Sequence, residues 1–239
     1  TVDAGLLSSG VDDLRRCGQR VCAVKTVDLL GRCADYDDSS AELEAREIAV
    51  VEDAAEALGA RLGDRAAGSY GQAAVVSFNG NKIMTTSGGG ALLTDDSKFA
   101  GHVRYLATQA RQPVVHYEHN DIGYNYRLSN LLAALGRAQL GRLDAMIECR
   151  RSVRLHYMEL FASQPGVTVF GEPSGLCGGS TRDNFWLTSI LVDANLAGFS
   201  AEELRLTLAH LDIEARPLWK PMHAQPVFAA ARRYLDGTS

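Results

Sequence analysis

The chain has 239 residues, 46% of them hydrophobic and 22% charged, so it can bury a sizeable core as an ordinary globular protein. Its formal net charge of −5 argues against a protein that binds nucleic acids or anionic membrane surfaces. No apolar run approaches the length of a membrane span, so we expect no membrane-spanning segment.

The cysteines and histidines indicate neither a disulfide framework nor a metal site. The five cysteines are an odd number without C-x-x-C spacing, which indicates reduced thiols and a cytoplasmic protein. His116 and His119 lie three residues apart, but no cysteine pair or further regularly spaced histidine completes a metal-binding set. The cysteines are Cys17, Cys22, Cys33, Cys149 and Cys177.

Short apolar runs recur along the first half of the chain and predict buried strands. A helix is expected over residues 97–110, because Pro113 follows and blocks its continuation. The alternation of strands with helix-prone or turn-forming residues favours an α/β fold with a mostly parallel sheet. The predicted strands cover residues 21–27, 48–51, 73–76 and 91–93.

Two ionisable side chains follow predicted strands, at the edge where open α/β sheets bind ligands. Asp53 follows strand 48–51, and Lys82 follows strand 73–76. A desolvated lysine has its neutral amine favoured, which Schiff-base chemistry with a carbonyl requires. From the local sequence alone, a structural lysine that bonds nearby carbonyl groups remains an open alternative. An acid and an amine at one rim are what pyridoxal phosphate needs, and Ser77 can offer its hydroxyl to the phosphate.

Three consecutive glycines at residues 88–90 follow Lys82 and raise the alternative of a phosphate-binding loop. The spacing G-x-x-x-x-G-K-[ST] is absent, and no G-x-G-x-x-G follows a strand. We therefore expect these glycines to let the backbone turn and return as the next strand, close beside Lys82.

The second half of the chain begins with an apolar stripe, spaced at three and four residues, that predicts one long helix over 129–163. Residues 185–192 alternate weakly and predict a strand. The segment 213–226 contains prolines and predicts an extended binding loop. Its cationic side chains either bind a diphosphate or are surface charges. They are Arg216, Lys220 and His223.

Three ordered motifs resemble the DegT/DnrJ/EryC1/StrS family of sugar aminotransferases. They are residues 51–59 (VEDAAEALG), 77–82 (SFNGNK) and 123–130 (GYNYRLSN). The resemblance implies the type I fold of pyridoxal phosphate-dependent aminotransferases, with a mostly parallel sheet in the large domain and a smaller α+β domain.

The resemblance also implies a domain organisation. Residues 1–128 are expected to be part of the large cofactor-binding domain, 129–163 the inter-domain helix, and 164–239 part of the small C-terminal domain. We expect the family's N-terminal part and its final C-terminal segment to be missing from this chain.

The activity implied by the resemblance is transamination, from glutamate to a keto-sugar nucleotide, with pyridoxal 5'-phosphate as cofactor. Lys82 would hold the cofactor's aldehyde, and Asp53 would keep its ring nitrogen protonated. Glu56 falls where the family places a polar residue near the hydroxyl edge of the ring. Asn125 and Arg127 match a motif that crosses a homodimer interface, so one or both would contact the neighbour's cofactor phosphate.

Two other functions remain open. One is a sugar dehydratase or deoxygenase of the same family, although such relatives can carry histidine at the position of Lys82. The other is a non-catalytic binding protein with this fold. The missing N-terminal part would supply phosphate contacts and an aromatic side chain over the ring, so we expect the 239 residues alone to bind the cofactor weakly.

Overall fold

The computed structural model describes residues 3–171 and 181–235, except the side chains of residues 37–39, so Cys177 lies outside the described residues. The described residues form two compact units. The first unit comprises residues 21–151 and 181–187. The second comprises residues 3–20, 152–171 and 188–235. The domain boundaries inferred from the sequence remain a prediction.

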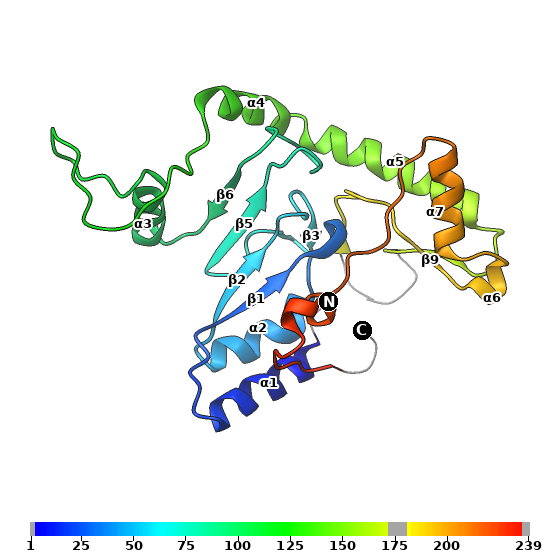
Figure 1. Ribbon diagram of the computed structural model, residues 1–239, viewed down its shortest axis with the longest axis horizontal. Coiled ribbons are helices and arrows are strands. Elements are labelled where there is room, and N and C mark those ends of the chain that lie inside the picture. Colours follow the sequence, from blue (N-terminus) through cyan, green and yellow to red (C-terminus); the bar gives the residue numbers. More distant parts are fainter. Residues whose placement is uncertain (1–2, 172–180, 236–239) are drawn as a thin grey trace. The chain divides into compact units, whose positions relative to one another are not determined.

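The first unit is built on a four-stranded sheet with the strand order β1-β2-β5-β6 (Figure 1). β2 runs parallel to both β1 and β5, whereas β6 is antiparallel to β5. The mixed α/β organisation with a mostly parallel sheet is therefore confirmed. The strands are β1 (Ala23–Val27), β2 (Ala49–Asp53), β5 (Ala73–Ser77) and β6 (Gly90–Leu93).

The turn between β5 and β6 carries Lys82 and is closed by its own backbone. The Phe78 amide donates to the Gly89 carbonyl oxygen at 2.9 Å, and the Thr86 amide donates to the Phe78 carbonyl oxygen at 2.9 Å. Gly90 pairs with Ser77, and a Cβ atom on Gly90 would lie 2.5 Å from the Val76 carbonyl oxygen. The glycine-containing segment thus turns the backbone and returns it as the next strand, as predicted.

Shorter elements complete the first unit. A second, small sheet has the order β4-β3-β8. The remaining elements are η1 (Leu29–Gly31), α2 (Tyr36–Ala45), β3 (Arg61–Leu62), β4 (Arg65–Ala66), α3 (Ser97–Ala107), α4 (Asn130–Leu140), the first part of α5 (Leu143–Phe161) and β8 (Thr181–Arg182).

The long helix predicted over 129–163 is two helices, α4 and α5. Gly141 caps α4, and the Arg142 amide donates to the Gln139 carbonyl oxygen at 2.9 Å, three residues back. Glycine has a low helix propensity, and this tighter turn interrupts the regular helical bonding. The apolar stripe continues across the break, which is why the sequence pattern did not reveal it.

The second unit contains a two-stranded antiparallel sheet of β7 and β9 and several helices. The capping box at the start of α7 is confirmed, because Ser200 and Glu203 exchange both of its hydrogen bonds. No helix of the described part of the chain has the length and apolar composition needed to cross a bilayer. The elements are α1 (Ala4–Arg16), the rest of α5, β7 (Val167–Val169), β9 (Ile190–Val192), α6 (Ala194–Ala197), α7 (Ala201–His210), η2 (Met222–Ala224) and η3 (Pro226–Phe228).

The strand predicted over 185–192 is wrong in its first half. Only β9 is a strand, and residues 183–189 have no regular structure. Phe185 has a positive φ of 57°, which interrupts an extended strand, and Asn184 and Trp186 bond to loops of the first unit instead of a neighbouring strand.

A buried polar network lies on one face of β1 and β2. Asp28 and Glu52 are both fully buried. One oxygen of Asp28 accepts hydrogen bonds from the Ala34 amide and the Tyr36 hydroxyl, both at 2.8 Å. Its other oxygen, Oδ2, has no hydrogen-bond partner among the described residues. Burial raises the pKa of Asp28 to about 7, with the Ala34 hydrogen bond opposing the rise and the neighbouring Glu52 carboxylate adding to it.

The protonation of Asp28 links folding to pH. The pKa of folded Asp28, about 7, lies above its ordinary value of 3.8. Between these pH values the folded protein holds a proton that the unfolded chain has released. This contribution to the free energy of unfolding is complete below the lower value and is lost as the pH rises through the higher one.

The Asp28→Asn variant tests this linkage, because asparagine stays neutral at every pH. We expect urea denaturation at several pH values to show a weaker decline in the unfolding free energy of the variant than of the wild type between about pH 4 and pH 8. An identical decline in both proteins would contradict a proton held by Asp28.

Candidate functional site

Asp53 and Lys82 lie at and just beyond the C-terminal ends of two neighbouring parallel strands. Asp53 is the last residue of β2, and Lys82 lies five residues beyond Ser77, the last residue of β5 (82 − 77 = 5). Both side chains are mostly buried, with 13% of Lys82 and 20% of Asp53 exposed. The fold therefore brings an amine and an acid to one edge of the sheet, where open α/β sheets bind ligands.

Glu56 is the carboxylate that faces Lys82. Its Oε1 lies 3.7 Å from the Lys82 Nζ, which is too long for a hydrogen bond, and its Oε2 accepts the Leu30 amide at 2.8 Å. Burial raises the pKa of Glu56, although the Leu30 hydrogen bond and the Lys82 charge both oppose the rise. Asp53 also adds to the rise through charge repulsion, so the two carboxylates share one electrostatic environment.

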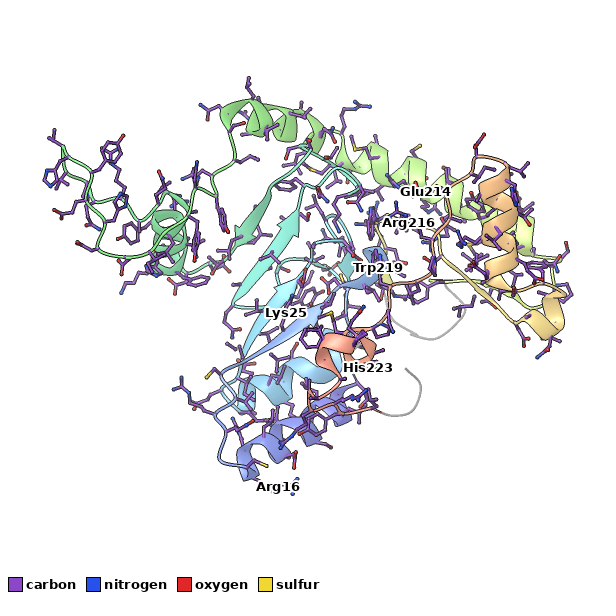
Figure 2. All side chains as sticks on the ribbon, in the orientation of Figure 1. Arg16, Lys25, Glu214, Arg216, Trp219 and His223 are labelled. Carbon is purple, nitrogen blue, oxygen red and sulfur yellow. The ribbon has the colours of Figure 1, made fainter. Side chains whose placement is uncertain are left out.

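Asp53 already has a cationic partner in the first unit. The Lys25 Nζ lies 2.7 Å from Asp53 Oδ2, and the Ala55 amide donates to Asp53 Oδ1 at 3.3 Å. Lys25, which is labelled in Figure 2, lies on β1, the strand next to that of Asp53. Its side chain is 62% exposed. The Lys25 ammonium stays in contact with water, so it can move aside from Asp53 for a ring N–H donor, or share the carboxylate with that donor.

Asn184 joins the loops that follow β1 and β2. Its side-chain amide donates to the carbonyl oxygens of Glu56 at 2.7 Å and Leu58 at 3.0 Å, and its backbone amide donates to the Gly31 carbonyl oxygen at 2.9 Å. Gly31 has a φ of 87°, and a Cβ atom there would lie 2.1 Å from the Asn184 side-chain oxygen. The position therefore requires glycine.

Trp186 extends this connection to the loop that follows β5. Its indole Nε1 donates to the Asn81 carbonyl oxygen at 2.6 Å, and the Lys82 Nζ lies 4.4 Å from the centre of its ring. Trp186 is fully buried in a core cluster with Leu30, Ile83 and Ile147. Sequence reasoning assigned residues 185–192 to a strand and missed this role. The signal available was an aromatic pair directly after two polar residues, Asp183 and Asn184.

The other residues proposed for the cofactor occupy two places in the first unit. Ser77 ends β5, and its hydroxyl oxygen accepts the Asn79 amide at 3.3 Å, which leaves the hydroxyl proton available to a ligand. Asn125 and Arg127 are exposed in the segment between α3 and α4, which Figure 1 shows extending beyond α3. Backbone bonds tie that segment to the end of α3, including Tyr126 amide to Ala107 carbonyl oxygen at 3.0 Å.

The cationic residues of segment 213–226 all lie in the second unit. Arg216 donates to the Glu214 carboxylate at 2.7 Å through Nε, and both side chains are exposed (Figure 2). The Lys220 carbonyl oxygen accepts the Gln225 side chain at 3.0 Å, and the His223 carbonyl oxygen accepts Arg233 at 3.1 Å. Their role in binding a diphosphate remains a prediction.

The histidines and cysteines make ordinary contacts. His116 lies 3.2 Å from the Glu118 carboxylate, and His119 lies 2.8 Å from the Gln109 carbonyl oxygen. No group of three or more metal-ligating side chains occurs among the described residues. None of the described cysteines forms a disulfide; they are Cys17, Cys22, Cys33 and Cys149.

This donor set fits the ring end of pyridoxal phosphate. The Lys82 amine has no hydrogen bond to Glu56 that a reaction would have to break, as the separation of 3.7 Å shows. The Asp53 carboxylate already accepts a cationic N–H donor, the role that a protonated ring nitrogen would fill. Ser77 offers one hydroxyl for the phosphate end.

Comparison with known proteins gives a consistent result. Residues 16–238 match the model of the DegT/DnrJ/EryC1/StrS aminotransferase family. The protein named "Putative pyridoxal phosphate-dependent aminotransferase EpsN", from Bacillus subtilis (strain 168), is 42% identical over 228 residues. That alignment covers 95% of this chain and 57% of EpsN.

Two solved structures share the fold. A DegT DnrJ EryC1 StrS aminotransferase from Brucella abortus aligns with a TM-score of 0.81 and 25% identity, over 95% of this chain and 58% of its own. DesI, solved in the presence of its TDP-sugar product, aligns with a TM-score of 0.77 and 27% identity, over 90% of this chain and 53% of its own.

The chain thus spans little more than half the length of the relatives it matches. Its sheet and helices have the type I fold of pyridoxal phosphate-dependent aminotransferases. Because the family model matches nearly the whole chain, this protein belongs to the DegT/DnrJ/EryC1/StrS aminotransferase family.

Proposed function

We propose that this protein is a pyridoxal phosphate-dependent aminotransferase. It moves an amino group from an amino-acid donor, which we propose is glutamate, to a keto-sugar nucleotide. The observation that carries the proposal is the meeting of Lys82, Asp53 and Glu56 at one edge of the parallel sheet. DesI, a relative in fold and sequence, has a TDP-sugar product, which supports a nucleotide-linked sugar as the acceptor.

Each residue has a separate task in this proposal. Bound pyridoxal phosphate supplies an aldehyde that condenses with amines and a protonated ring that accepts electron density from the substrate carbon. Asp53 would accept a hydrogen bond from the ring nitrogen and so keep that nitrogen protonated. Lys82 would hold the aldehyde carbon, and its Nζ is the group of this chain that would take up and return the proton of the substrate carbon.

Glu56 and the strand-end loops set the charge around Lys82. Glu56 lies against the Lys82 ammonium without a hydrogen bond to it, so it attracts the charge and leaves the nitrogen free to move. The Leu30 amide holds Glu56 in place. Arg216, Lys220 and His223 are proposed to meet the diphosphate of the sugar nucleotide, because cationic side chains recognise phosphate through charge-assisted hydrogen bonds.

The amino-acid half of the reaction tests this proposal without the sugar. We expect the protein, loaded with pyridoxal phosphate and given 15N-glutamate, to release one equivalent of 2-oxoglutarate and to hold 15N in the cofactor. The Lys82→Ala variant should do so at least about 100-fold more slowly, because the proton carrier is lost. Lys25→Met is the matched control, since it removes a lysine at the same sheet edge that is only an exposed partner of Asp53.

Two outcomes would contradict the proposal. One is a loaded wild-type protein from which no common amino acid releases its keto acid. The other is a Lys82→Ala variant that reacts as fast as Lys25→Met.

We also propose that the active unit is a homodimer with shared sites. The segment between α3 and α4 exposes large apolar and aromatic side chains, a composition typical of partner-binding surfaces. Asn125 and Arg127 lie within the same exposed segment, so a partner docked there would receive their donors. The exposed side chains are Val114, Val115, Tyr117, Ile122, Tyr124 and Tyr126.

Mixing two inactive proteins tests the shared site. A Lys82→Ala chain and an Asn125→Ala, Arg127→Ala chain each lack one half of every site. In a hybrid dimer one site regains both halves, so random exchange should restore about a quarter of the wild-type activity in the half-reaction with glutamate. If the mixture stays inactive after subunit exchange has been verified, the shared site is ruled out.

A further inference from the structure

The indole ring of Trp186 and the ammonium of Lys82 form a contact that has no role in the proposed function as described above. The Lys82 Nζ lies 4.4 Å from the ring centre, within the range of a cation–π interaction. Trp186 is 1% exposed, and only 13% of the Lys82 side chain is exposed. Such a contact strengthens when water is excluded from both groups.

The ring is fixed in place by bonds on several sides. Its Nε1 donates to the carbonyl oxygen of Asn81, the residue directly before Lys82. Its backbone amide donates to the Asn184 side-chain oxygen at 2.8 Å, and its carbonyl oxygen accepts the Arg150 guanidinium at 2.6 Å. The same indole therefore holds the backbone next to Lys82 with its edge and faces the Lys82 ammonium with its π surface.

Glu56 attracts the ammonium but does not fix its position through a hydrogen bond. Its Oε1 is 3.7 Å from the Lys82 Nζ, beyond hydrogen-bond distance, and its Oε2 is committed to the Leu30 amide. A cation–π contact has no single bonding direction, so it confines the nitrogen to a region and still lets it swing. A direct carboxylate hydrogen bond would hold the nitrogen in one geometry.

We propose that Trp186 is a positioning residue that holds the ammonium of Lys82 over its indole face whenever Lys82 is not bound to a carbonyl carbon. The second part of this inference rests on the proposed function. When Lys82 is released during transamination, the ring keeps its Nζ within the region from which it transfers the proton.

The contact itself is testable without cofactor. The chain has four lysines, Lys25, Lys82, Lys98 and Lys220, so labelling the lysine ε-carbons with 13C gives four signals to resolve by NMR. We expect the Lys82 ε-protons to be shifted upfield by the indole ring current and to show nuclear Overhauser contacts with the ring protons of Trp186. If the wild-type protein shows neither the upfield shift nor the Overhauser contacts, the inference is overturned. This test uses only the wild-type protein, so it does not depend on whether a variant folds.

Variants then distinguish the effect of the aromatic ring from the effect of the hydrogen bonds of the indole. Trp186→Leu should abolish the upfield ring-current shift of the Lys82 signal, whereas Trp186→Phe keeps a ring and should retain part of the shift. Trp219→Leu is the matched control, because it removes the other of the two tryptophans and should leave the Lys82 signal unchanged. An unchanged Lys82 signal in a folded Trp186→Leu protein would also overturn the inference.

The role in catalysis is measured as a split between kinetic constants. In the half-reaction with glutamate, Trp186→Leu should lower the limiting single-turnover rate constant about tenfold, with little change in the glutamate concentration that gives half of it, because a misplaced proton carrier slows a step after binding. Trp186→Phe should recover most of that loss. If the NMR contact is present and the single-turnover rate constant of Trp186→Leu stays at the wild-type value, the positioning role is wrong while the proposed function stands. If the wild type shows the contact but no half-reaction, the proposed function fails while the contact stands.

Discussion

The hydrogen bonds of Asn184 are the interaction on which the candidate site depends. They connect the backbone after β1, at Gly31, to the backbone after β2, at Glu56 and Leu58, and Trp186 adds the loop after β5. Each such bond contributes about 1 kcal/mol net, but leaving a buried partner unsatisfied costs about 1–3 kcal/mol. Loss of Asn184 would therefore make several strand-end loops less rigid together. The distance between Lys82 and Glu56, which these loops hold, would then no longer be fixed.

The alternation of side chains along the strands sorts the carboxylates of this region into two roles. Glu52 points to the buried face of β2 and accepts the backbone amides of Gly68 and Tyr70, so it stabilises the fold. Asp53, the next residue, points to the opposite face and meets Lys25. Asp28 shares the buried side with Glu52, where burial raises its pKa. Two adjacent acids, Glu52 and Asp53, thus have different roles, one in stabilising the fold and one in the candidate site, because successive side chains of a strand point to opposite faces.

The sequence predicted where the residues at the strand ends would lie. The positions of Lys82 and Asp53 at one edge of the sheet could be predicted because parallel strands deliver their C-terminal ends to one edge, and each of these residues follows a recognisable apolar run. The turn at residues 88–90 could also be predicted, since glycine tolerates the close approach to Val76. These inferences used only local patterns and one general rule of sheet topology.

The rest of the site depends on contacts between residues far apart in the chain. Trp186 reaches Asn81 across 105 positions, and no periodicity in either segment encodes that pairing. The positive φ of Phe185 breaks a strand that the weak apolar alternation favours. The break between α4 and α5 was hidden because the apolar stripe passes through Gly141. In each case tertiary contacts or local backbone geometry override the pattern.

The most direct test of the account is the identity of the amine that captures pyridoxal phosphate. Borohydride reduction of the protein with its cofactor, followed by peptide mapping, fixes the pyridoxyl group to the lysine that held it. The account predicts the label on Lys82, the lysine that lies against Glu56 and the Trp186 ring. A pyridoxyl group on Lys25, Lys98 or Lys220, with Lys82 unlabelled, would contradict it.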